Sequence, residues 1–280
     1  MAHILIVDGS NLLFQMFYGM PARILNAQGK PIQGTLGFTG ALLKMIRMVR
    51  PTHVAVVFDG ECANDRTLLD ADYKANREDL SQVPEEDTPF SQLPDIRAAL
   101  DCLGICHGET TDCEADDWIA GYALGYGSEH RVTVASQDSD FFQLINDNVH
   151  ILRYRGQSSV LCDPAYIREK LGIEPGQYAD LKALTGDAAD NIRGADKIGP
   201  KTAAELLGQL GTLKGILAGI SEVRKPSIRE SLERNAQRLR LNYRLICLDG
   251  AARLPFAMEQ MAWQDSGMTT TQVLQTIGLR

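Results

Sequence analysis

Three short apolar runs, each ending on an aspartate, constrain the fold of this chain more than any other feature. They cover residues 4–8, 54–59 and 132–138, and they end on Asp8, Asp59 and Asp138. Short runs rich in Val and Ile are typical of strands buried on both faces, as in a parallel sheet covered by helices. Residues 36–49 have the apolar spacing of a helix, which predicts a right-handed crossover between the first two strands. We therefore expect an α/β fold with a mostly parallel central sheet flanked by helices.

The position of the three aspartates predicts a cation site. In a parallel α/β sheet, the ligand lies at the carboxyl ends of the strands. Three carboxylates brought to that edge would repel one another unless a cation were bound between them. We therefore interpret this edge as a divalent-metal site.

Composition and segment lengths are those of a soluble globular protein. The chain has 280 residues, of which 44% are hydrophobic and 23% charged. It opens directly into a strand pattern without a signal-peptide pattern, and no apolar run approaches the roughly 20 residues needed to cross a bilayer. The six cysteines show no paired Cys-x-x-Cys spacing, so we expect unlinked thiols. These features predict a cytoplasmic protein, which we expect to be a monomer.

Charge is distributed unevenly along the chain. The net charge is −8, yet residues 193–244 hold eleven basic and five acidic residues, a local charge of +6. An acidic, metal-binding half joined to a basic half would suit a phosphodiester substrate. The alternative is that the basic residues are simply the solvated surface of a helical region.

The pattern divides the chain near residue 180. Residues 61–94 break the alternation of strands and helices, after which helices are expected at 93–103 and 114–126, the second capped by Thr111 or Asp112. A further helix is expected after Asp138, and the chain has a helical pattern from about residue 166 to 243. We therefore expect an α/β domain over 1–180 and a helical part over 181–280, packed on that domain.

Further carboxylates fall at the ends of predicted elements. Each cluster also has an ordinary structural explanation, as a helix cap, a turn or an exposed helix face. Asp187 and Asp190 would lie on the same face if this segment formed a helix. Taken together with the strand ends, they make nine candidate ligands: Asp8, Asp59, Glu114, Asp116, Asp117, Asp138, Asp140, Asp187 and Asp190. Oxygen ligands without histidine favour Mg²⁺ or Mn²⁺, and two such ions about 4 Å apart can clamp a phosphodiester. A glycoside hydrolase needs two carboxylates at a defined separation, which explains so large a cluster less well.

Six motifs in order resemble the bacterial and phage 5′-nuclease family. They lie at residues 5–13, 72–77, 114–117, 136–140, 186–192 and 199–203. The family includes flap endonucleases and the 5′–3′ exonuclease domain of bacterial DNA polymerase I, and this chain resembles a free-standing member. The resemblance implies a PIN-like α/β nuclease domain and a C-terminal helical part that carries a helix–three-turn–helix DNA-binding element.

The resemblance also assigns roles to residues. It implies a first metal site formed by Asp8, Asp59, Glu114 and Asp116. A second site would use Asp117, Asp138, Asp140, Asp187 and Asp190, with Asp116 near both. Lys74 and Arg77 would neutralise charge on the scissile phosphate, Tyr73 would stack on an unpaired base, and Arg66 joins this catalytic group.

The helix–three-turn–helix element would hold the duplex without reading its sequence. The resemblance places it at Gly194, Ile198, Gly199, Lys201 and Thr202, with backbone N–H groups at a helix N-terminus facing phosphate. It also implies a K⁺ ion on the carbonyl groups of the turn. Three features depart from the family pattern and bear on DNA affinity and on threading of single strands: Gln15, the pair Arg193 and Asp196, and the acidic segment 78–89.

The function that these observations predict is a structure-dependent 5′-nuclease. It would hydrolyse DNA phosphodiesters at 5′ ends, flaps or nicks by a two-metal-ion mechanism with Mg²⁺ or Mn²⁺, in DNA replication or repair. One alternative is a PIN-type ribonuclease, which shares a compact acidic site. The other is a DNA-binding protein with weak or vestigial nuclease activity.

Overall fold

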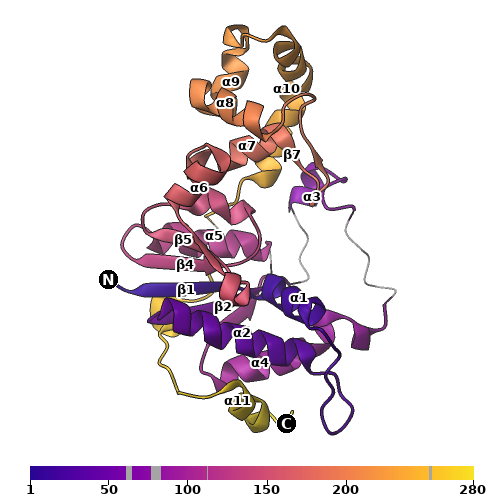
Figure 1. Ribbon diagram of the computed structural model, residues 1–280, viewed down its shortest axis with the longest axis vertical. Helices are drawn as coiled ribbons and strands as arrows, with labels where there is room; N and C mark the ends of the chain where they lie inside the picture. The colour runs from indigo at the N-terminus through magenta and orange to yellow at the C-terminus, as the bar shows by residue number, and fades with distance from the viewer. Residues whose placement is uncertain (61–64, 77–82, 112, 252–253) are drawn as a thin grey trace.

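A six-stranded sheet lies at the centre of the molecule (Figure 1). The structure is a computed structural model that describes residues 1–60, 65–76, 83–111, 113–251 and 254–280. The strand order is β3-β2-β1-β4-β5-β6. The strands are β1 (His3–Asp8), β2 (His53–Phe58), β3 (Cys106–Glu109), β4 (Arg131–Ala135), β5 (Val149–Arg153) and β6 (Val160–Cys162). The first five are mutually parallel and β6 is antiparallel, which confirms the predicted α/β fold.

Helices cover both faces of the sheet, because alternate residues of the central strands point to opposite sides. Leu5 and Val7 of β1 join one core cluster, whereas Ile4 and Ile6 join the other. The first cluster packs against α1 (Gly9–Gly19), α2 (Gln33–Val49), α4 (Leu93–Cys102) and α11 (Thr270–Thr276); the second packs against α5 (Ala115–Tyr126). All four central residues of β1 are fully buried, as expected for a strand between two helical layers.

A helical part extends from one side of the sheet (Figure 1). It contains α6 (Pro164–Leu171), α7 (Tyr178–Thr185), α8 (Pro200–Leu210), α9 (Leu213–Ala218) and α10 (Pro226–Ile246). Its buried side chains belong to the same core cluster as α5, so the helical part is packed continuously onto the α/β part. The remaining short helices are α3 (Asp65–Leu69), η2 (Glu85–Asp87), η3 (Pro89–Gln92), η4 (Asp140–Leu144), η5 (Gly156–Ser158), η6 (Pro175–Gln177), η7 (Ile220–Glu222) and η8 (Met258–Met261).

Three local predictions were wrong. The helix expected after Asp138 is the single 3-10 turn η4. The segment from Asp187 to Asp190 is not helical but joins β7 (Gly186–Asp187) to β8 (Ile192–Arg193) in an antiparallel hairpin. Glu114, rather than Thr111, occupies the N-cap position of α5, and Asp112, the other expected cap, lies outside the described residues.

Residues 258–280 return to the α/β part. Ala262 forms a bridge with His53 at the start of β2, and the indole N–H of Trp263 donates to the carbonyl of Leu103 at 3.0 Å. Helix α11 packs on α2 and α4, with Val273 fully buried. Within the described part of the chain, none of the helices combines the length and the apolar character that crossing a bilayer requires.

Candidate metal centre

Five of the predicted carboxylates meet at the carboxyl edge of the sheet. Asp8 ends β1, Asp59 follows β2, and Asp138 lies three residues beyond β4. Together with Glu114 and Asp116 at the start of α5, they line a pocket of about 490 Å³ that also contains Lys74. The pocket forms because β1, β2 and β4 are adjacent and parallel, so that their carboxyl ends lie side by side.

Asp8 is the buried centre of this pocket. Its side chain accepts a hydrogen bond from the Asn11 N–H at 2.9 Å and another from the Ser136 hydroxyl at 2.7 Å. Burial, with smaller contributions from the nearby Asp59 and Asp138, raises the pKa of Asp8 to about 7, although these hydrogen bonds lower it. Burial likewise raises the pKa of Asp116 well above its usual range, and Asp8 and Asp138 add to that effect. The pocket therefore disfavours its own negative charge and would be stabilised by a cation.

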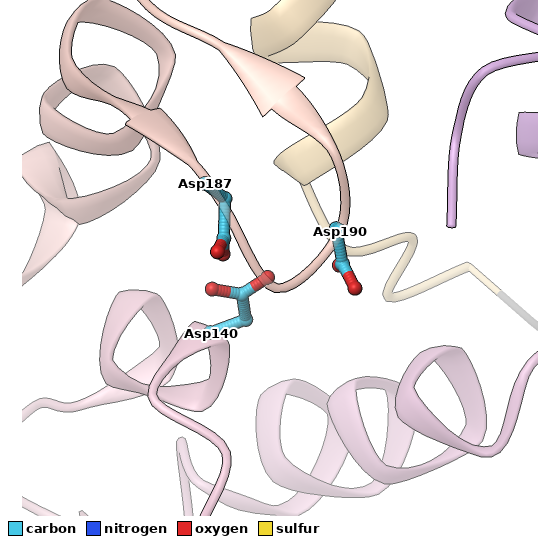
Figure 2. Close-up of side chains that lie close together, drawn as sticks. All are labelled: Asp140, Asp187 and Asp190. Carbon is cyan, nitrogen blue, oxygen red and sulfur yellow. The ribbon is translucent and has the colours of Figure 1, made fainter. Parts of the chain in front are cut away.

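Three of the remaining four carboxylates form a second group. Asp140 lies on η4, and Asp187 and Asp190 lie on the β7–β8 hairpin. Each offers one oxygen atom, and these atoms lie within 4.8 Å of one another, so they could hold a metal ion. Figure 2 shows the three side chains pointing toward a shared space. Burial, with a smaller contribution from Asp138, raises the pKa of Asp140 to about 7.

Asp138 connects the two groups. The N–H of Asp140 donates to the Asp138 carboxylate at 2.8 Å, and the N–H of Asp138 bonds the Ser136 hydroxyl at 3.0 Å. The same hydroxyl bonds Asp8, so a short hydrogen-bonded path runs from Asp8 to Asp140. Because Asp138 raises the pKa of both Asp8 and Asp140, the two groups act as one electrostatic centre.

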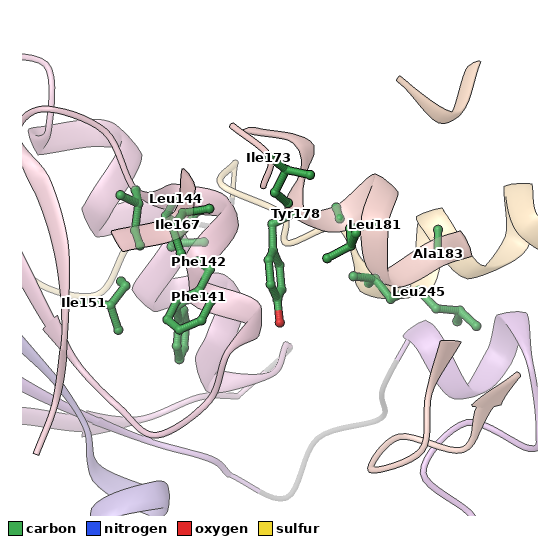
Figure 3. Close-up of a cluster of buried hydrophobic side chains, with 14 of the residues drawn as sticks. Phe141, Phe142, Leu144, Ile151, Ile167, Ile173, Tyr178, Leu181, Ala183 and Leu245 are labelled. Carbon is green, nitrogen blue, oxygen red and sulfur yellow. The ribbon is translucent and has the colours of Figure 1, made fainter. Parts of the chain in front are cut away.

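Packing against the helical part holds η4 in place. Phe142 meets the ring of Tyr178 edge-on at 5.4 Å, and Phe141 is almost fully buried. Figure 3 shows Tyr178 between these phenylalanines and Leu181, which lies on the same helix α7 as Tyr178. Asp140 is therefore placed by contacts between the α/β part and the helical part.

The hairpin depends on two glycines at its base. Gly186 has φ of 83°, a left-handed conformation that favours glycine. A Cβ atom on Gly186 would overlap the backbone of Gly194, and one on Gly194 would overlap the backbone of Thr185 and Gly186. This close approach sets the position of Asp187 and Asp190.

The structure places Asp117 away from both groups. Its two carboxylate oxygens accept from the Arg66 guanidinium at 2.7 and 3.0 Å, and one also accepts from the Asp249 N–H at 2.9 Å. Asp117 therefore anchors Arg66, whereas the family resemblance implied that it belongs to the second metal site. Eight of the nine predicted carboxylates thus fall in the two groups.

Glu114 connects two basic residues of the predicted catalytic group, Lys74 and Arg66, to the pocket. It forms ion pairs with Lys74 and Arg66, which lower its pKa although burial opposes that shift. Tyr73 is only 5% exposed and its hydroxyl lies 3.5 Å from Glu114, so its ring is packed in the core rather than available for base stacking. Arg77 lies outside the described residues.

Two polar side chains in the centre were missed by the sequence analysis. Lys182 on α7 forms an ion pair with Asp187 and lies 3.9 Å from Asp140. Ser136 contacts Asp8 as described above. Ser136 belongs to the motif at residues 136–140, and this position could have identified it as a site residue. Lys182 lies in an ordinary helical pattern, which gave no such signal.

The predicted DNA-binding turn precedes α8. Gly199 is the N-cap residue, no side chain caps the helix, and Lys201 lies exposed in its first turn with Thr202 beside it. Ile198 is buried and Gly194 closes the hairpin, so these two residues support the turn rather than face solvent. The first N–H groups of α8 are thus placed as an anion site requires.

The acidic centre is not the largest hollow in the described part of the molecule. A groove of about 690 Å³ lies between α9 and α10 and is lined by Leu213, Leu217 and Tyr243 among others. Its lining is mostly apolar with basic residues at the rim, and it contains none of the predicted ligands.

The donor set at the sheet edge, which consists of carboxylate oxygens, suits a hard divalent cation.

Comparison with known families matches almost the whole chain. A model described as "5'-3' exonuclease, N-terminal resolvase-like domain" matches residues 3–172, and one described as "5'-3' exonuclease, C-terminal SAM fold" matches residues 173–269.

Curated relatives are much longer proteins. DNA polymerase I of Rhizobium leguminosarum is 37% identical over 254 residues, covering 88% of this chain and 24% of the polymerase. Thermostable DNA polymerase I of Thermus aquaticus is 36% identical over 243 residues, covering 86% of this chain and 28% of the polymerase. The chain thus spans less than a third of the length of these relatives.

Solved structures share the fold. The bacteriophage T5 flap endonuclease, in a complex with DNA and metal ions, aligns with a TM-score of 0.72 at 23% identity, covering 88% of this chain and 89% of the phage protein. T5 5′-exonuclease with bound zinc ions aligns at 0.73 and 21% identity, covering 98% and 99%. The catalytic core of Rad2 with a DNA substrate aligns at 0.60 and 17% identity, covering 98% and 92%.

Proposed function

The chain belongs to the 5′–3′ exonuclease family, as its motifs predicted, and from this premise we propose that it is a Mg²⁺-dependent, structure-dependent 5′-nuclease that hydrolyses DNA phosphodiesters at 5′ ends, flaps or nicks. The observation that carries the proposal is the pair of carboxylate groups joined through Asp138 at one edge of the sheet. Mn²⁺ would serve in place of Mg²⁺, since both ions prefer oxygen ligands.

The residues of the first group would hold one cation and those of the second group another. When bound, two such ions activate the attacking water and stabilise charge on the departing oxygen. We assign Asp8, Asp59, Glu114 and Asp116 to the first and Asp140, Asp187 and Asp190 to the second, with Asp138 between them. Asp117 is left out because Arg66 occupies both of its oxygens.

Lysine side chains supply fixed positive charge beside the carboxylates. Lys74 lines the pocket and pairs with Glu114, so it can approach a phosphate held over the carboxylates and stabilise the charge that develops on it. Lys182 neutralises Asp187 and orients it toward Asp140 and Asp190. Arg66 acts indirectly, by holding Glu114 from the side opposite Lys74.

The helical part would hold the duplex. The uncapped N-terminus of α8, with Lys201 and Thr202 in its first turn, suits a backbone phosphate, and carbonyl groups of the preceding turn would accept K⁺. Relatives of known structure include nucleases in complex with DNA. In this division of labour, residues 1–180 carry out cleavage and residues 181–280 contribute the DNA grip, in a monomeric cytoplasmic enzyme.

Cleavage assays test the proposal. A labelled 5′ flap, a nicked duplex and a matched RNA are incubated with the protein and Mg²⁺, Mn²⁺ or chelator. We expect release of short 5′ products from DNA with either metal, no product with chelator, and loss of activity in Asp138→Asn. Asp147→Asn changes an exposed aspartate in the bend before β5, so it is the matched control and retains activity.

The alternatives give different results in the same assay. A PIN-type ribonuclease would cleave the RNA in preference to both DNA substrates. A DNA-binding protein with vestigial chemistry would retain the flap in a gel shift and cleave none of the substrates at any metal concentration.

A further inference from the structure

Two turns from distant parts of the sequence face each other beside the metal centre. One is the segment from Asp72 to Asn76, which carries Lys74, and the other is the tip of the β7–β8 hairpin from Ala188 to Asn191. Three hydrogen bonds join them, and we call these bonds the latch. The Lys74 N–H donates to the Asp190 carbonyl at 3.0 Å, the Asn76 amide to the Ala188 carbonyl at 2.9 Å, and the Asn191 amide to the Asp72 carbonyl at 2.8 Å.

The backbone on both sides of the latch is held in an uncommon conformation. Lys74 has φ of 57° and Asn191 has φ of 58°, both in the left-handed region. Asparagine tolerates this region, whereas for lysine it is uncommon and persists where surrounding contacts enforce it. The hydrogen bond from the Lys74 N–H is such a contact, so the hairpin tip helps to fix the turn that presents the lysine.

Each turn carries one side of the metal centre. Lys74 pairs with Glu114 of the first carboxylate group, and Asp187 and Asp190 belong to the second group. Both asparagines reach across with their side-chain amides to backbone carbonyls, so the latch joins the two turns in both directions. A shift of the hairpin tip would therefore be transmitted to the backbone of Lys74.

We propose that Asn76 and Asn191 are positioning residues that couple the Asp140–Asp187–Asp190 group to Lys74. A cation held by that group fixes the hairpin tip, and the latch then fixes the turn that aims Lys74 into the pocket. The coupling is reciprocal: whatever orders the Lys74 turn also favours the arrangement of Asp187 and Asp190 that holds a cation. This inference rests on the proposed function for the cation at Asp140, Asp187 and Asp190 and for the effect on cleavage, whereas the hydrogen bonds of the latch do not depend on it.

Amide hydrogen exchange tests the latch without requiring catalysis. The 280-residue wild-type chain is compared with Asn191→Gly, which keeps the left-handed backbone accessible and removes the amide donor. We expect exchange at the Lys74 amide to be about tenfold faster in the variant, since its hydrogen-bond acceptor is no longer held. Added Mg²⁺ slows that exchange in the wild type and has little effect in the variant.

Asn148→Ala is the matched control for this experiment. The Asn148 amide also joins two separate segments by donating to a backbone carbonyl, that of Gly127, at 2.9 Å, but it does so away from the metal centre. Exchange at Lys74 stays at the wild-type rate in this control. Unchanged exchange at Lys74 in Asn191→Gly, or equal responses to Mg²⁺ in wild type and variant, overturns the proposal.

Single-turnover cleavage provides the second test. The double variant Asn76→Ala/Asn191→Gly is expected to cleave a 5′ flap about tenfold more slowly with unchanged DNA affinity, because small misplacements of a catalytic group are costly. In a Lys74→Ala background the same double substitution adds no further loss, since the latch acts through Lys74.

Other outcomes separate the two proposals. One contrary result is that the double substitution lowers the cleavage rate by the same factor in the Lys74→Ala background as in the wild type, and another is that it lowers DNA affinity alone. Either result means that the asparagines do not act through Lys74 and overturns the latch. If the wild-type protein cleaves no substrate, the proposed function fails, and the exchange experiment still decides whether the latch exists.

Discussion

At the scale of single residues, the metal centre destabilises the folded protein when no cation is bound. Asp8 is only 5% exposed, and the protein holds it against the neighbouring carboxylates with two hydrogen bonds instead of a cationic side chain. Lysines partly relieve the repulsion at the edges of the centre, through Glu114 and Asp187. The site is thus built for a ligand at the expense of stability in its absence.

Removing one of these charges should stabilise the metal-free protein. We expect Asp140→Asn in chelator at pH 8 to raise the melting temperature by roughly 2–5 °C, because about 1–2 kcal/mol of repulsion and desolvation is lost. In millimolar Mg²⁺ the order reverses, since the wild type gains more from binding the metal. Thermal melts in both conditions check this, and a variant that melts lower than wild type in chelator contradicts it.

The pH dependence follows from the raised pKa values of Asp8 and Asp140, about 7 in each case. The folded state binds their protons more tightly than the unfolded state, so their contribution to stability is present below about pH 4 and is lost as the pH rises through 7. A metal ion requires the ionised carboxylates, so its affinity should fall about tenfold per pH unit below 7 for each proton displaced.

Calorimetric titration of Mg²⁺ at a series of pH values measures this effect. Burial also lowers the pKa values of His3, His53 and His150. Their contribution to folding stability has the opposite sign and is lost as the pH falls below 6.5. Comparing wild type with Asp140→Asn isolates the effect of Asp140, because both proteins share these histidines. A metal affinity independent of pH between 6 and 8 would contradict the assignment.

Asp117 distinguishes a structural carboxylate from a ligand. We expect Asp117→Ala to destabilise the protein by about 3 kcal/mol, because it leaves the buried Arg66 without its main partner. The rise in melting temperature on adding Mg²⁺ should persist. If instead the metal effect disappears while metal-free stability is kept, Asp117 is a ligand after all.

At the scale of elements, the β7–β8 hairpin is the feature that completes the site. Its turn brings Asp187 and Asp190 together, and contact between Gly186 and Gly194 sets its base. A helix would also have brought these two carboxylates together on one face. Its backbone carbonyls would have bonded within the helix, however, and would not have been available to contact the Lys74 turn.

Adding a methyl group at the base of the hairpin should disrupt the second group. Gly186→Ala is expected to lower stability by about 2–3 kcal/mol, because the new Cβ overlaps backbone and the left-handed conformation is strained. Its response to Mg²⁺ should also weaken. Gly208→Ala in α8, where nothing lies within 4 Å of the added carbon, is the control and should be neutral or stabilising.

Elements with a strong pattern were predicted best. The apolar runs located β1, β2 and β4 because buried parallel strands are continuous and hydrophobic. Strands β5 and β6 were not identified, and η4 was expected to be a longer helix. The hairpin was missed because two-residue strands have no periodicity, and its conformation depends on tertiary contacts with Gly194.

The candidate site was predictable in outline and not in detail. Strand ends gather at one edge by topology, so Asp8, Asp59 and Asp138 could be placed together from sequence. The separation of Asp117 from its neighbour Asp116 depends on the rotation of α5 and on Arg66, which no local pattern reveals. Lys182 likewise becomes part of the site only because α7 packs against η4.

At the scale of the whole molecule, opposite charges separate along the chain. The acidic centre lies at the sheet edge, whereas the segment 193–244 carries a net charge of +6. In the proposed arrangement, a duplex held at α8 would place its backbone phosphates against the basic part, and the acidic centre would need to accept only the scissile phosphate.

DNA binding should reflect this separation. Lys201→Ala is expected to weaken binding of a flap duplex about equally for all sequences and to reduce the slope of log affinity against log salt by about one. Fluorescence anisotropy at several salt concentrations measures both quantities. Lys44→Ala, an exposed lysine on α2, is the control, and an unchanged salt slope in Lys201→Ala would place the grip elsewhere.

The return of residues 258–280 to the sheet has a consequence for synthesis. Val273 packs in a cluster with side chains of α2, and Leu274 packs in a cluster with Ile32. On the ribosome, these contacts can form only after more than ninety residues beyond residue 180 have been translated. A nascent chain halted in α10 would therefore carry every acidic ligand and still lack α11, the last helix of the layer that also contains α1, α2 and α4.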